Sequence, residues 1–72
     1  MVTIEGIREK IRRCKRDYTE ADTFTQVSNI DYSILLYLSK VEYALLKGKF
    51  APQEKREIYR GYYRLKKLRG DI

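Results

Sequence analysis

Arginine, lysine and tyrosine alternate along the last third of the chain at three- and four-residue steps. On a helix, this spacing would place them on one face, opposite Ile58 and Leu65. Arginine binds phosphate through a planar fork of hydrogen-bond donors, and tyrosine rings stack on exposed bases. The simpler alternative is that the tyrosines pack at the rim of a small core and the basic side chains are only solvated. The pattern predicts nucleic-acid contacts, mainly with phosphates, through Arg56, Tyr59, Arg60, Tyr63, Arg64 and Lys67.

A second basic series lies near the start of the chain. Arg8, Arg12 and Arg16 recur every four residues and could extend the same surface. The chain has 16 lysine or arginine residues and 10 acidic ones, for a net charge of +6, yet residues 19–39 contain three acids and no base. Two basic end segments favour a polyanionic partner, DNA or RNA, although they would equally suit helices with solvated outer faces.

Residues that commonly carry catalysis or bind metals are scarce. The chain has no histidine, and Cys14 is its one cysteine. Two acidic pairs, Glu5 with Glu9 and Glu54 with Glu57, lie near expected helix starts, where the helix dipole favours acids. Without a histidine to activate it, a thiol on an apolar seam is more typical of a core than of a nucleophile. We therefore expect no enzyme activity, no cofactor and no metal site.

Three helices would position these residues, at 4–18, 29–47 and 52–69. The first has one narrow apolar seam at helical spacing, made of Ile4, Ile7, Ile11, Cys14 and Tyr18. The third begins with Pro52, which suits a first helical turn, and is closed by Gly70. Within it, Gly61 either allows a close approach of a neighbouring helix or weakens the helix. We expect an all-α fold, a compact three-helix domain that spans residues 1–72.

The segment between the first two helices is predicted to be a loop. Residues 19–27 have no helical period and contain three threonines. Phe24 would anchor this loop to the core. Ser28 would cap the central helix, with Asp31 three residues later in the arrangement of a capping box.

The expected central helix is apolar almost all round, and the rest of the chain is organised around it. Ile34, Leu38 and Val41 mark one face. A second strip lies nearly opposite and contains Tyr32, Leu35, Leu36, Tyr43 and Leu46. Such a long apolar helix must be covered on more than one side, and we expect the flanking helices to cover it. If Tyr32, Leu36 and Tyr43 stay uncovered, an antiparallel homodimer of central helices would bury them.

Two other interpretations start from the same residues. Ala44 and Gly48 have the spacing of a helix-turn-helix motif, although charged residues such as Lys47 and Glu57 fall where that motif needs apolar ones. The chain could also be an accessory subunit or inhibitor of a larger protein, steered to an acidic surface by its basic faces. No apolar run is long enough for a membrane span or a signal peptide, so we expect a cytoplasmic protein without membrane contact.

Overall fold

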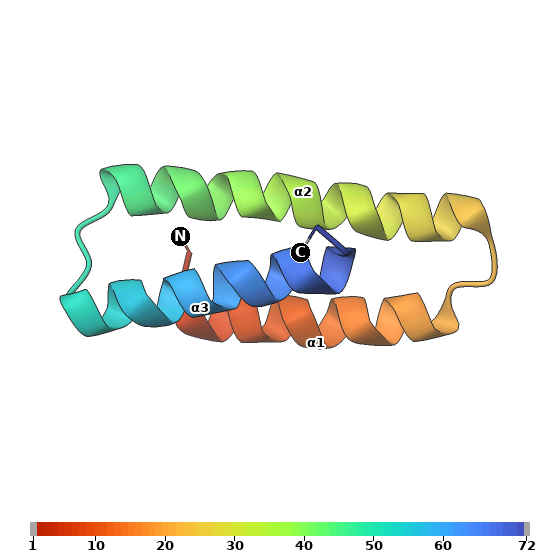
Figure 1. Ribbon diagram of the computed structural model, residues 1–72, viewed down its shortest axis with the longest axis horizontal. Helices are drawn as coiled ribbons and strands as arrows, with labels where there is room; N and C mark the ends of the chain where they lie inside the picture. Colours follow the sequence, from red (N-terminus) through yellow and green to blue (C-terminus); the bar gives the residue numbers. More distant parts are fainter. Residues whose placement is uncertain (1, 72) are drawn as a thin grey trace.

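The computed structural model describes residues 2–71 and contains three α-helices joined by short connections (Figure 1). The helices are α1 (Ile4–Glu20), α2 (Phe24–Lys47) and α3 (Pro52–Arg69). Helices α1 and α3 lie side by side and run in the same direction, while α2 runs antiparallel to both (Figure 1). The predicted all-α fold is confirmed for the described residues, and the bounds of the third helix agree with the prediction.

All three helices contribute to one hydrophobic core. The buried side chains are those of Ile7, Ile11, Cys14, Ile34, Leu38, Val41, Ile58 and Leu65. They belong to the inward faces that the helical periodicity predicts. Burial raises the pKa of the Cys14 thiol, which keeps it in the unreactive protonated form. This cysteine is therefore a core residue, as predicted.

The first connection is shorter than the sequence suggested, and the predicted loop over residues 19–27 is wrong. Helix α1 continues to Glu20, and α2 already begins at Phe24. The cap of α2 is Thr23, whose hydroxyl accepts a hydrogen bond from the Gln26 backbone N–H, while the Gln26 side chain accepts one from the Thr23 N–H. This reciprocal capping box satisfies two backbone donors at the start of α2. Ser28 lies inside the helix, so the expected cap at that residue does not form.

Two residues near this connection have other roles than those predicted. Phe24 does not anchor anything to the core, because its side chain is 85% exposed at the first turn of α2. Asp31 lies inside α2 and accepts a hydrogen bond from the hydroxyl of Tyr18. It therefore joins α1 to α2 and takes no part in a helix cap.

Helices α1 and α3 approach closely at Gly61. This glycine is buried, and a Cβ atom added to it would lie 2.5 Å from Cγ2 of Ile7. Only a glycine fits at this distance without a shift of Ile7 or of the helices, so the close-approach explanation of Gly61 is confirmed. Figure 1 also shows that the two helices are offset along their axes: α3 extends beyond the start of α1, and α1 extends beyond the end of α3.

The second connection does not form a helix-turn-helix unit. Helix α3 folds back alongside α2 (Figure 1). The Tyr62 hydroxyl donates a hydrogen bond of 2.6 Å to the Glu42 carboxylate across the two helices. The two helices of a helix-turn-helix instead cross at a large angle. Gly48 has an ordinary φ of −79°, whereas Gly70 closes α3 with a left-handed φ of 93°.

Candidate nucleic-acid interface

A shallow basic groove follows the junction of α1 and α3. It consists of two adjoining depressions, which share Arg8, Ile11 and Arg64 as lining residues. Its lining combines apolar side chains and Gly61 with cationic side chains and with one acidic side chain, that of Glu57. The cations of this basic groove are Arg8, Arg12 and Lys15 from α1, and Arg60 and Arg64 from α3.

The close contact between the two helices explains why these cations gather. Arg60 and Arg64 lie beside Gly61 on the edge of α3 that meets α1. On α1, Arg8 stands next to Ile7, the side chain that touches Gly61. A larger residue at position 61 would hold the helices apart and separate their basic side chains. The groove is thus a product of tertiary packing as much as of local sequence.

Acidic neighbours reduce the positive charge of α1 more than that of α3. On α1, a guanidinium nitrogen of Arg8 lies 3.8 Å from the Glu5 carboxylate, and one of Arg12 lies 3.2 Å from Glu9. These pairs are exposed, and such pairs contribute little to stability, so a phosphate can replace the carboxylates. Among residues 2–71, the basic side chains that form no ion pair include those on the exposed side of α3, Arg56, Arg60, Arg64 and Lys67.

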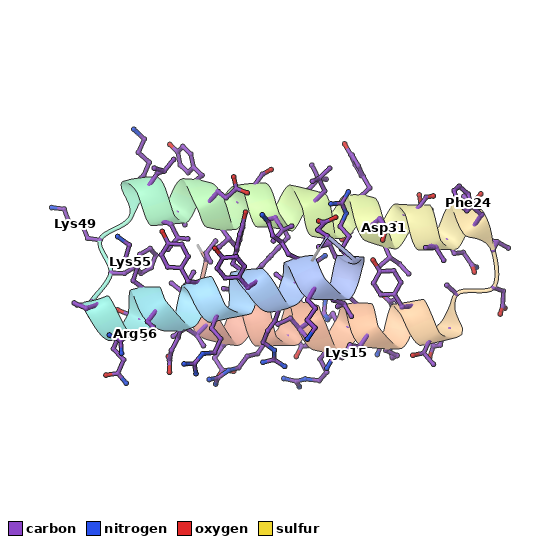
Figure 2. The ribbon with its side chains drawn as sticks, viewed as in Figure 1. Lys15, Phe24, Asp31, Lys49, Lys55 and Arg56 are labelled. Carbon is purple, nitrogen blue, oxygen red and sulfur yellow. The ribbon has the colours of Figure 1, made fainter. Side chains whose placement is uncertain are left out.

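The structure separates the predicted basic residues into two groups. Arg8, Arg12, Arg60 and Arg64 meet in the groove, as described above. Arg56 and Lys67 fall on the outer side of α3. Figure 2 shows Arg56 near the start of α3, pointing away from α2. Arg16 does not line the groove, and its guanidinium lies 3.7 Å from the neighbouring Asp17 carboxylate.

Lys15 is the groove residue that the sequence argument missed. It lies seven residues, about two helical turns, after Arg8, which puts both on the same side of α1. Figure 2 shows Lys15 projecting from the α1 and α3 side of the molecule, away from α2. The seven-residue step was the signal that could have identified it, in place of the four-residue step to Arg16.

Tyr59 and Tyr63 have exposed rings on α3. Their side chains are 43% and 55% exposed, so neither is buried in the core. The ring of Tyr63 packs edge-on against Tyr62, with 5.7 Å between the centroids. Tyr62 itself faces inward, and burial together with its hydrogen bond to Glu42 raises its pKa. The two outer rings are thus accessible, and they flank the basic side chains of α3.

The far side of the molecule carries an apolar surface. We call it the outer strip of α2, and its residues are Tyr32, Leu35, Leu36, Tyr43 and Leu46. The prediction that flanking helices cover the central helix on more than one side is wrong. Because α1 and α3 pack side by side, both cover the face that contains Ile34, Leu38 and Val41, and the outer strip is left exposed. Tyr43 is 66% exposed and Leu46 is 81% exposed.

Comparisons of the chain with protein-family models, with curated proteins and with solved structures find no match. In the part of the chain that the structure describes, no helix has the length and apolar character to span a membrane. Within the same residues, no group of three or more acidic or cysteine side chains could hold a metal ion. The function is therefore inferred from the two surfaces, the basic groove and the outer strip.

Proposed function

We propose that the protein binds nucleic acid without catalysis, through phosphate contacts made by the basic groove. The observation that carries this proposal is the convergence of cations from two helices at opposite ends of the sequence. Arg8 and Arg64 line the same depression, although they belong to α1 and α3. Solvated outer faces alone would require no such convergence.

The dimensions and the chemistry of the groove suit a phosphate backbone. The lining of the groove runs along α1 from Ile4 to Lys15, which is about 17 Å of helix at about 1.5 Å per residue. One turn of duplex measures about 34 Å, so the groove can follow phosphates over about half a turn. The unpaired arginines of α3 offer donor forks that match phosphate oxygens. Arg56 and Lys67 would extend the contact, and Tyr59 and Tyr63 would pack on sugars or stack on unpaired bases.

Salt-dependent binding tests this proposal. The parent should bind a DNA duplex, a single strand or an RNA at low salt, with an affinity that falls steeply as salt rises. Each phosphate contact contributes about 0.9 to the slope of log K against log salt on duplex DNA. Replacing Arg8, Arg60 and Arg64 with Gln should therefore reduce that slope by about 2–3 while the helical content stays unchanged.

A charge-matched variant is the control. Lys47, Lys49 and Lys55 lie around the α2–α3 connection, outside the groove, and Figure 2 shows Lys49 and Lys55 there. Replacing these three lysines with Gln removes the same charge and should change the slope much less. The proposal is wrong if none of the three nucleic acids binds at low salt. It is also wrong if the slope of log K against log salt falls as much in the control variant as in the groove variant.

The second proposed interaction is the pairing of two copies through the outer strip of α2. The exposed parts of its five side chains amount to roughly 500–600 Å² per copy, and a standard interface buries about 800 Å² per partner. Residues between them on the same face, such as Ser39, would supply the remainder. An antiparallel pair centred on Ser39 would place Tyr32 opposite Leu46 of the second copy, and Leu35 opposite Tyr43.

Charge favours α2 as the place where two copies meet. Helix α2 contains two acids and two bases, Asp31, Glu42, Lys40 and Lys47, so its own net charge is zero. The remaining chain carries the whole +6. Contact through α1 or α3 would bring basic surfaces together, whereas contact through α2 keeps them apart. An accessory subunit or inhibitor that docks this strip on a larger protein is the alternative.

Sedimentation at micromolar concentration distinguishes these two uses of the outer strip. The parent should sediment as a dimer, and Tyr43→Glu should be a monomer, because pairing would bury its carboxylate without a partner. Phe24→Glu is the matched control, since Phe24 is exposed on the same helix outside the strip. A monomeric parent overturns the pairing and leaves docking on another protein as the use of this surface.

A further inference from the structure

The basic groove and the outer strip lie on opposite sides of the molecule. Leu38 and Val41 point from α2 toward the other two helices, and the strip lies half a turn round α2 from them. Figure 2 shows Lys15 and Arg56 projecting from α1 and α3 on the side that faces away from α2. One surface can therefore be occupied without covering the other.

Pairing through α2 would determine where the two basic grooves of a dimer face. The two α2 helices would form the middle of the assembly, with the α1 and α3 layers of both copies outside. The grooves would then face in opposite directions. We propose that the dimer bridges two separate nucleic-acid segments, one in each groove; this inference rests on the proposed function and on the proposed pairing.

The stiffness of duplex nucleic acid favours bridging over the wrapping of one segment. The short dimensions of a single chain are 22 and 17 Å, so the two grooves would be separated by roughly twice such a thickness. A short duplex would have to bend around the whole dimer to reach both. Bending a site of 20–30 base pairs by only 40–90° already costs about 1–6 kcal/mol. Two separate segments would fill both grooves without that cost.

Electrostatics also allows two segments to bind at once. Each groove neutralises the phosphates that lie on it. The Debye length at physiological salt is about 8 Å, well below the separation of the grooves. Repulsion between the two bound segments is therefore screened, and occupation of one groove does not prevent occupation of the other.

A two-duplex capture assay tests the bridge. One DNA duplex of about 20 base pairs, long enough to fill one groove, is immobilised, and a second, fluorescent duplex is added with the protein. The parent should retain the fluorescent duplex, with a maximum at intermediate protein concentration, because excess protein saturates each duplex separately. Tyr43→Glu should retain at least tenfold less while it still binds a single duplex in solution.

Control variants separate the possible failures. Phe24→Glu should capture like the parent, and the Arg8, Arg60 and Arg64 triple variant should lose both capture and binding. If Tyr43→Glu does not fold, Leu36→Lys is used in its place, because it also introduces a charge into the outer strip. A parent that binds one duplex and sediments as a dimer but captures no second duplex overturns the bridge alone. A parent that binds no nucleic acid overturns the proposed function as well, and undiminished capture by a monomeric variant also overturns the bridge.

Discussion

The two faces of α2 are both apolar, yet they lie in opposite environments. On the inner face, Ile34 and Val41 are fully buried. On the outer face, Tyr32 and Tyr43 are each more than 60% exposed. The difference arises because α1 and α3 meet each other at Gly61 and so share one side of α2. Apolar residues on a helix therefore indicate which faces require burial, whereas the packing of the neighbouring helices decides which face receives it.

The largest expected effect is the difference in the free energy of unfolding between a truncation on the inner face of α2 and the same truncation on its outer face. Leu38→Ala should lower the free energy of unfolding by about 2–4 kcal/mol, because it leaves a cavity in the core. This is most of the stability available to a domain of this size, about 3–5 kcal/mol. Leu36→Ala removes the same atoms from the outer face and should cost only about 0.5 kcal/mol in dilute protein.

Urea unfolding followed by circular dichroism measures both values. At higher protein concentration, the free energy of unfolding of Leu36→Ala should fall further below that of the parent. Pairing through the outer strip would stabilise the parent more than the variant. Equal losses for the two variants in dilute protein would mean that the two faces of α2 do not differ as described.

The second prediction concerns the contact between Ile7 and Gly61, which holds α1 and α3 together on one side of α2. Gly61→Ala should gain about 1 kcal/mol of helix propensity but lose more through the collision of its Cβ with Ile7. A net destabilisation of about 1–2 kcal/mol is expected. The same change made in an Ile7→Ala background should be neutral or stabilising, because the collision is gone. A thermal-melting double-mutant cycle measures this coupling, and additive effects would contradict it.

The smallest expected effect is at the hydrogen bond between α1 and α2. Tyr18→Phe removes the hydroxyl that donates to Asp31 and should cost about 1 kcal/mol at neutral pH. Burial first, and then this hydrogen bond to the carboxylate, raise the pKa of Tyr18. Its contribution is therefore complete below the ordinary tyrosine pKa, about 10, and is lost as the pH rises further.

Melting temperatures between neutral pH and the strongly alkaline range test the direction of this effect. The stability difference between the parent and Tyr18→Phe should narrow above the ordinary tyrosine pKa, because only the parent loses the contribution of Tyr18. A difference that stays constant would show that Tyr18 has the same pKa in the folded and unfolded chains.

Local features of the fold followed from the sequence. Helical spacing placed Ile7 and Ile11 in the core, and it identified the inner face of α2 correctly. Pro52 and Gly70 marked the ends of α3, because each suits only a particular position at a helix end. These predictions succeeded because they depend on the periodicity or the backbone preference of a single segment.

Features that depend on a choice between competing partners did not follow. Thr23 with Gln26 and Ser28 with Asp31 are both plausible helix caps, and the sequence alone does not rank them. One helix alone does not determine the exposure of the outer strip, nor does it determine that the α1 side that carries Arg8 and Lys15 meets the arginines of α3. Both result from the side-by-side packing of α1 and α3, which depends on a contact between Ile7 and Gly61, far apart in the chain.

The Ile7–Gly61 contact also has a consequence for the order in which the molecule assembles. Short connections join α1 to α2 and α2 to α3, so these neighbours can pair early, whereas α1 and α3 must close a loop that contains all of α2. We expect their contact, and with it the basic groove, to form last and to open first. A nucleic-acid backbone bound across both helices would stabilise this contact between α1 and α3, and it would therefore slow the unfolding of the whole protein.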